Sequence, residues 1–121
     1  MNREIKFRAW DGEKIVHPDY IDRDGVAWWT ENSIPEKSTV IMQFTGLKDR
    51  RGLDIYEGDL LLVAKNHTYE VVFLLEDEYG EMISSFGLRR WDETFFAIDH
   101  FAVKNGIVVG SIYENPELLN P

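Results

Sequence analysis

The sequence predicts a mainly β fold, a small barrel or sandwich that is preceded by a β-hairpin. Three observations predict it. Apolar and polar residues alternate in several short segments, which is the period of a half-buried strand. These segments recur about every 8–12 residues and are separated by turns that contain glycine. The run Leu60–Ala64 is apolar on both faces, which favours a central strand covered on both sides.

The N-terminal part begins with a clear strand signal and then loses it. Residues 5–10 alternate in polarity, and Asp11-Gly12 is a hairpin turn pair, so we expect a β-hairpin that closes with a strand over 14–16. Residues 17–38 are interrupted by proline, glycine and asparagine, and only 26–29 is strand-like. We therefore expect a long loop with one short strand, whose Trp28-Trp29 pair is either tucked under the sheet or displayed at a contact surface.

The rest of the chain contains most of the predicted strands. They are expected over residues 39–44, 60–64, 68–75, 82–86 and 107–113. Residues 91–101 fit a strand or one helical turn, and we favour a strand. Asn105-Gly106 is typical of a type I′ turn. Asn115 followed by Pro116 predicts a short C-terminal helical turn.

These signals divide the chain into two regions. Residues 1–38 are expected to form the N-terminal β-hairpin and the long loop, and residues 39–121 the barrel. The total of 121 residues is a usual size for one domain with a small appendage.

The charge of the chain bears on its partners. It has 13 Lys and Arg residues and 22 Asp and Glu residues, for a net charge of −9. Phosphate neutralisation needs a positive field, so nucleic acid is an unlikely partner, and an anionic membrane surface is disfavoured for the same reason. The basic cluster Lys48, Arg50 and Arg51 is interpreted as a solvated turn.

The N-terminal residues and the absence of cysteine indicate in which cellular compartment the protein is expected. The first residues are charged and contain no apolar signal region, and no apolar run is long enough to span a bilayer. Cysteine is absent, so disulfides and Cys-ligated metals are excluded. We expect a cytoplasmic protein.

Residue patterns that carry catalysis are missing. His17, His67 and His100 are far apart and have no metal-ligand spacing, and Ser84-Ser85 has no nucleophile-elbow setting. The acids at 76–81 are interpreted as solubility and edge-protecting charges, with a weak calcium site as the alternative. We assign no catalytic, cofactor-binding or metal-binding residue, and we expect no enzyme activity.

Two short motifs have a structural and a functional interpretation. Gly58 between Glu57 and Asp59 suits a tight turn before an apolar strand, and the alternative is a divalent-cation site on the two carboxylates. Trp10 before Asp11 suits an aromatic anchor that packs the N-terminal region onto the barrel, and the alternative is a stacking platform. We favour the structural interpretation for both.

Four blocks of residues, taken in order, carry a family resemblance: residues 5–11, 42–49, 55–60 and 109–118. The second block contains Gly46, and the fourth contains Tyr113, Asn115 and Pro116. Together the blocks resemble the YopX family of phage and prophage proteins. Phe44 and Ser111 depart from residues that are frequent in the family, Tyr and Asn.

The resemblance implies an SH3-like barrel and an origin in a phage or prophage. It implies no reaction, so no catalytic residue is carried over from the family. Sixteen aromatic residues are more than a small barrel is expected to hide, so some should lie at a protein contact. We therefore expect a protein-binding or self-associating module. Self-association would give a homo-oligomer. The alternative is an acidic DNA mimic or host-enzyme inhibitor, with carboxylates at 76–81 and at Asp92 and Glu93.

Overall fold

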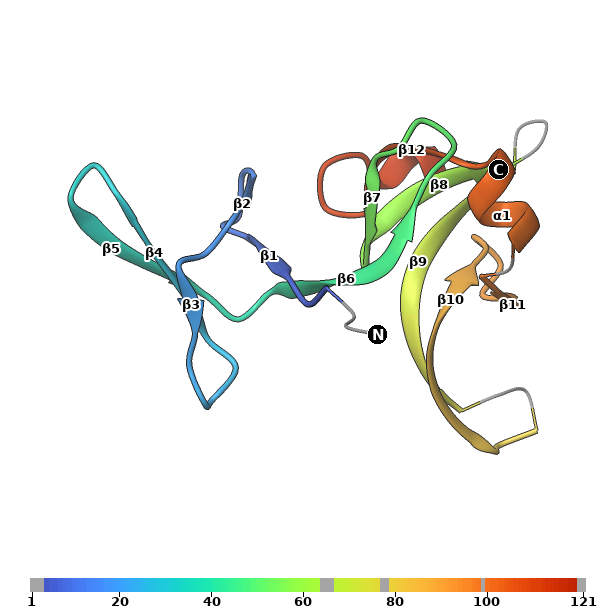
Figure 1. Ribbon diagram of the computed structural model, residues 1–121, viewed down its shortest axis with the longest axis horizontal. Coiled ribbons are helices and arrows are strands. Elements are labelled where there is room, and N and C mark those ends of the chain that lie inside the picture. The colour runs from blue at the N-terminus through green and yellow to red at the C-terminus, as the bar shows by residue number, and fades with distance from the viewer. Residues whose placement is uncertain (1–3, 64–66, 77–78, 99, 120–121) are drawn as a thin grey trace. The chain divides into compact units, whose positions relative to one another are not determined.

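A computed structural model gives the arrangement of the chain (Figure 1) and describes residues 4–63, 67–76, 79–98 and 100–119, with only the backbone described at 83, 100, 101 and 103. Among the described residues, strands predominate and helix is confined to two short segments, which confirms the mainly β class. The chain forms two compact units, Met1–Phe44 and Thr45–Pro121.

The first unit contains a small antiparallel sheet built around β1 (Phe7–Trp10). On one side β1 pairs with β2 (Ile15–Val16), and on the other with the first residues of β6 (Ile41–Lys48). Asp11 closes the β1–β2 connection, because its Oδ1 accepts the N–H groups of Glu13 and Lys14 at 2.7 and 2.8 Å. These backbone donors hold the pKa of Asp11 below its usual value.

Residues 17–38 contain more strand than the sequence predicts. Instead of a long loop with one short strand, they form the antiparallel sheet β3 (Tyr20–Ile21), β4 (Ala27–Glu31) and β5 (Ile34–Ser38). Asn32 and Ser33 both take positive φ and form the tight turn between β4 and β5. β5 was missed because its first four residues are exposed and include a proline and two charges, so it has no apolar alternation.

The tryptophan pair on β4 serves both faces of this sheet. Trp29 is only 7% exposed and packs in a core with Ala9 and Ala27. Trp28 lies on the opposite face, where its ring stacks on Tyr20 with 6.5 Å between ring centroids. Its Nε1 donates to Asp22 Oδ2 at 2.9 Å. Trp29 is therefore tucked under the sheet, whereas display of Trp28 at a contact surface stays a prediction.

The second unit contains a curled, half-barrel sheet of five antiparallel strands. Its interior strand β8 (Asp59–Val63) confirms the predicted covered strand, because four of its five residues are buried. The short strand β7 (Asp54–Tyr56) lies beside β6. In order, the five strands are β11 (Phe95–Ala97), β10 (Met82–Arg89), β9 (His67–Glu76), β8 and β12 (Ile107–Ser111). The buried core consists of Ile55, Leu61, Val63, Val71, Leu88 and Ala102.

A short helix between β11 and β12 was not predicted. α1 (His100–Asn105) follows a strand of only three residues, where a strand over 91–101 was favoured. The type I′ turn expected at Asn105-Gly106 is wrong, because Asn105 ends α1 and the Gly106 N–H donates to the Ala102 carbonyl at 2.8 Å. Glycine is required there by space, since a Cβ at Gly106 would lie 2.5 Å from that carbonyl oxygen and 3.0 Å from Leu61.

The end of β6 and the C-terminal turn were also predicted from the sequence. β6 does not end at Thr45-Gly46 but runs on to Lys48, and Gly46 takes a φ of 87° within it. The predicted C-terminal helical turn is present as the 3₁₀ helix η1 (Pro116–Leu119). No helix in the described part of the chain has the length and apolar character that crossing a membrane requires.

Candidate functional site

The third and fourth sequence blocks meet in the second unit at Gly58. Gly58 takes a φ of 89°, a conformation that side chains disfavour. Its N–H donates to the Val71 carbonyl and its carbonyl accepts from the Ile112 N–H, both at 2.8 Å. Asp59, the next residue, lies opposite Ser111 in the β8–β12 pair. This turn therefore ties β8, β9 and the C-terminal segment together.

Asp59 directs its carboxylate into this turn. The side chain is 1% exposed, and Oδ2 accepts the Tyr56 N–H at 2.7 Å across the Glu57-Gly58 turn. Glu57 is half-buried. Among the described residues, no group of three metal-ligating side chains lies close enough to hold an ion. The arrangement is that of a structural turn motif.

Asp49 is a second buried carboxylate, and the sequence reasoning did not single it out. Its Oδ1 accepts the N–H groups of Arg51 and Leu53 at 2.8 and 2.9 Å, and its Oδ2 accepts that of Val108 at 2.9 Å. Burial alone would raise the pKa of Asp49, but the three backbone donors outweigh it and the net shift is downward. The signal available in the sequence is an aspartate three residues before Gly52, whose N–H donates to the Asp49 carbonyl.

The basic cluster beside Asp49 is also engaged within the turn. Lys48 Nζ forms an ion pair with Asp54 at 2.7 Å, and Arg51 Nη2 donates to the Val108 carbonyl at 2.8 Å. The Arg50 N–H donates to the Gly106 carbonyl. These contacts favour the interpretation of the cluster as a turn.

The C-terminal block folds back on itself. Ser111 Oγ accepts the Glu114 N–H at 3.0 Å, and the Asn115 N–H donates to the Ser111 carbonyl at 2.8 Å. Pro116 then begins η1, and Tyr113 is exposed. This compact turn holds Asn115 against β12.

Gly110 and Asn115 are in close contact, and this predicts a coupled effect on stability. A Cβ at Gly110 would lie 2.3 Å from Asn115 Oδ1 and 3.1 Å from Asn115 Cβ. Gly110→Ala is expected to lower the free energy of unfolding by about 2 kcal/mol, since the added methyl group displaces Asn115. Urea unfolding of Gly110→Ala, Asn115→Ala and the double variant measures the coupling. A smaller penalty for Gly110→Ala in the Asn115→Ala background is expected, and equal penalties would exclude the contact as the cause.

The remaining predicted residues lie apart from these turns. Trp10 is half-buried in the first unit, where its backbone N–H donates to the Val40 carbonyl at 3.0 Å, and its role as an anchor stays a prediction. His17 and His67 are exposed, and the side chain of His100 lies outside the described part of the structure. Ser84 takes positive φ in an irregular part of β10, between Met82 and Ser85.

The long β9–β10 hairpin extends beyond the strands on either side of it. β9 pairs with β8 only from His67 to Glu70, and β10 pairs with β11 only from Gly87 to Arg89. Within the described residues, the rest of the hairpin is therefore a two-stranded ribbon that runs on past its neighbours (Figure 1). Because residues two apart on a strand share a face, the core face at Val71 continues along this ribbon.

An apolar face follows from that geometry, made by Phe73, Leu75, Phe86 and Phe96. Phe73 and Phe86 are opposite each other and meet edge to face, with 5.2 Å between ring centroids. Phe96 lies opposite the core residue Leu88. Phe73 is 41% exposed and Leu75 60% exposed. The face that is buried at Val71 is therefore exposed to solvent farther along the hairpin.

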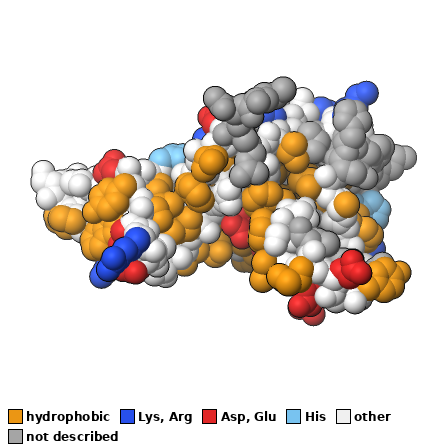
Figure 2. Space-filling view, turned by 60° about the horizontal axis from the view of Figure 1, so that its bottom comes forward, with side chains coloured by type: hydrophobic (Ala, Val, Ile, Leu, Met, Phe, Trp, Pro, Cys, Tyr) orange, Lys and Arg blue, Asp and Glu red, His pale blue; other side chains and the backbone are white. Residues whose placement is uncertain are grey.

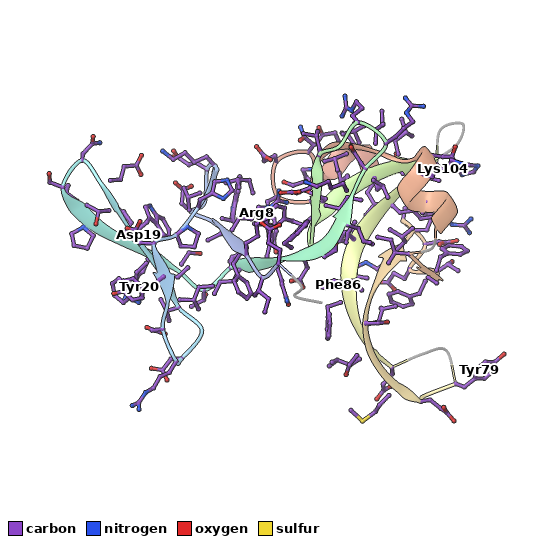
Figure 3. The ribbon with its side chains drawn as sticks, in the orientation of Figure 1. Arg8, Asp19, Tyr20, Tyr79, Phe86 and Lys104 are labelled. Carbon is purple, nitrogen blue, oxygen red and sulfur yellow. The ribbon has the colours of Figure 1, made fainter. Side chains whose placement is uncertain are left out.

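The tip of the hairpin combines exposed apolar and acidic side chains. Tyr79, at the tip in Figure 3, and Met82 are both largely exposed, and Phe86 lies farther back along β10. Glu76 and Glu81 are exposed beside them. Figure 2 shows hydrophobic and acidic side chains next to one another at its lower right, where the hairpin comes forward.

Comparison with known proteins agrees with the sequence blocks. The model of the family described as YopX protein matches residues 6–120. The chain belongs to the YopX family. This YopX-family chain is also similar to protein EF1440 from Enterococcus faecalis, whose crystal structure has 25% sequence identity and a TM-score of 0.61, with 98% of this chain and 100% of that chain covered. No curated protein matches it.

Proposed function

We propose that this YopX-family chain is a non-enzymatic, protein-binding module that binds its partner through the apolar face of the β9–β10 hairpin. The observation that supports the proposal is the exposure of Phe73 and Leu75 on a ribbon that has no other strand beside it in the described residues. A two-stranded ribbon is only marginally stable alone in water. A partner that covers it would stabilise it.

The sequence of β9 supports the same proposal. Residues 71–75 read Val-Val-Phe-Leu-Leu, which is typical of a strand that is buried on both faces. From their exposed fractions, the four side chains of the apolar face present on the order of 300 Å² of surface. Patches of roughly 300–600 Å² on a monomer often mark binding sites. The exposed area is thus in the range of a functional contact.

Three finer statements belong to this proposal. The second unit is an SH3-like barrel, a fold class that binds through loops and sheet edges. The family resemblance gives the protein a phage or prophage origin, with the bacterial cytoplasm as its compartment. The bound protein is either a different protein or a second copy of the chain. The exposure of Phe73 and Leu75 supports the binding surface.

A pair of matched variants tests the proposed surface. Leu75→Ser removes an exposed leucine from the apolar face, and Leu53→Ser removes a leucine of similar exposure, 51%, from the turn after Asp49. Affinity capture from bacterial lysate should retain a partner on the wild-type chain and on Leu53→Ser, and lose it on Leu75→Ser. Loss is expected to be at least about tenfold, because the centre of an apolar contact dominates binding.

Two results would count against this surface. One is a partner that Leu75→Ser retains as strongly as Leu53→Ser does. The other is the absence of any partner together with a monomeric mass in sedimentation at high concentration. A partner that is retained by Leu75→Ser and released by salt would instead support the acidic DNA-mimic alternative.

A further inference from the structure

We infer that the partner of the β9–β10 hairpin is an extended strand of another protein, which pairs with the free edge of β9 at Phe73 and Leu75. The inference rests on the proposed function and names the form in which the partner binds. Its basis is the direction of the backbone groups of β9, which is independent of the side chains. A sheet edge with unpaired N–H and C=O groups is a template for one further strand.

The hydrogen bond at Gly58 fixes which backbone groups of β9 are turned outward. The Val71 carbonyl accepts the Gly58 N–H at 2.8 Å, on the side of β9 where β8 begins. In an antiparallel sheet, the N–H and carbonyl of one residue point to the same side, and successive residues alternate. Phe73 and Leu75 therefore turn their backbone groups to this side, whereas the residues on either side of Phe73 turn theirs to β10.

The outward backbone groups of Phe73 and Leu75 have no partner within the residues that the structure describes. The pairing of β9 with β8 stops at Glu70, and no backbone hydrogen bond from another described segment reaches Phe73 or Leu75. η1 approaches β9, but within the same residues it forms no backbone hydrogen bond with it. Phe73 and Leu75 thus combine unpaired backbone groups with exposed apolar side chains.

The opposite edge of the ribbon is less suited to a further strand. β9 pairs with β10 residue by residue from Glu70 to Leu74, but two residues of β10 then lie opposite Leu75. Ser84, one of these two, takes a φ of 46°. Such a bulge bends the strand and disrupts its hydrogen-bonding pattern. The regular edge of β9 is therefore the one that a partner strand can follow.

The other edge strands in the described part of the chain are short or protected. β2, β3, β7 and β11 have two or three residues each. β5 contains Pro35 and Lys37, which hinder the addition of a strand. On β12, the Val108 N–H donates to Asp49 and the Val108 carbonyl accepts from Arg51. Residues 71–75 of β9 contain no proline, glycine or charge, so this edge lacks these protections.

A second copy of the chain is the less suitable source of the strand. Each copy carries a net charge of −9, which opposes the close approach of two copies. Pairing of two β9 edges is therefore an outcome of the test. A dimer in which the Phe73 and Leu75 amides are protected from hydrogen exchange, with the protection lost on dilution, would overturn the inference in favour of a second copy.

A set of matched peptides tests the inference with the full chain. The parent peptide alternates valine and threonine, with a lysine at each end for solubility. When its valines pair with Phe73 and Leu75, the valine side chains lie on the same face as theirs. The valine-methylated peptide carries N-methyl groups on the valines and loses the N–H groups of this pairing. The threonine-methylated peptide loses only N–H groups that point away from β9.

Fluorescence anisotropy of the labelled peptides measures their affinity for the chain. The parent and the threonine-methylated peptide are expected to bind equally. The valine-methylated peptide should bind at least about tenfold more weakly, because the donors to the Phe73 and Leu75 carbonyls are lost. Equal affinity of the two methylated peptides, or no binding by the parent peptide, would overturn the inference.

Amide hydrogen exchange, followed by NMR, locates the pairing without any substitution. On saturation with the parent peptide, the Phe73 and Leu75 amides should be protected at least about tenfold more than in the free chain. The Val72 and Leu74 amides face β10 and should change little. New protection at a different edge, or at none, would show that the peptide does not pair with β9.

The outcomes separate the inference from the proposed function. If both methylated peptides bind equally and lose affinity with Leu75→Ser but not with Leu53→Ser, the apolar face stands and the strand pairing is wrong. If Leu75→Ser leaves the affinity of the parent peptide unchanged and the valine-methylated peptide is weak, the strand pairing stands and the apolar face gains no support.

Discussion

Asp59→Ala is expected to destabilise the second unit by about 3 kcal/mol, among the largest effects of any single substitution in the chain. The substitution removes the buried Oδ2 that accepts the Tyr56 N–H, and this N–H has no access to water in the folded chain. It also loosens the turn at Gly58 through which β9 and the C-terminal segment are joined. Urea unfolding followed by far-ultraviolet circular dichroism measures the loss.

Asp59→Asn is the control for this effect. Asparagine keeps one carbonyl oxygen for the Tyr56 N–H and has nearly the same size, so its penalty should be clearly smaller than that of alanine. If divalent cations stabilised the wild-type chain and not Asp59→Asn, the carboxylate would be a cation ligand, and the structural interpretation of the turn would be wrong.

Asp49→Asn is expected to lower the stability by about 2–3 kcal/mol at neutral pH. Asparagine has one acceptor oxygen, while the two oxygens of Asp49 accept three backbone N–H groups. Its amide nitrogen must therefore face at least one of these donors.

The same carboxylate predicts the direction of the pH dependence. Because the pKa of Asp49 is lowered in the folded chain from its usual 3.8, the folded state is stabilised by ionisation. This contribution is complete above the unfolded pKa and is lost as the pH falls through the lower, folded pKa. Urea midpoints between about pH 2 and 7 should fall with acid more steeply for the wild-type chain than for Asp49→Asn. Parallel curves would show that Asp49 does not supply this contribution.

Alternation of polarity predicted the strands that have one or two well-covered faces. β8 lies where its apolar run places it, because burial on both faces leaves a long apolar signal in the sequence. β9 also lies where its apolar run places it, although Phe73 and Leu75 in that run are exposed. β5 has no such signal, since its solvent-exposed residues are free to be polar. α1 is too short to establish a helical period. The pair Asn105-Gly106 at its end has the sequence of a hairpin turn, but the glycine is needed there because of its close approach to Ala102 and Leu61.

The sequence predicted that apolar residues would be exposed at a contact surface, but not which residues form it. The number of aromatic residues indicates that some must be exposed, but composition does not say which. The run at 71–75 predicts burial on both faces, and only the pairing of strands shows that the pairing of β9 with β8 stops at Glu70 and leaves Phe73 and Leu75 uncovered. Asp49 was missed because one of its three backbone donors, the Val108 N–H, lies far away in the sequence.

Amide NMR of the full chain during titration with the partner retained by affinity capture is the most direct measurement of the central claim, that the β9–β10 hairpin is the binding surface. The account predicts that the largest shifts fall on Phe73, Leu75 and Phe86, with little change in the first unit. Largest shifts in the first unit, at Tyr20 and Trp28, would contradict it.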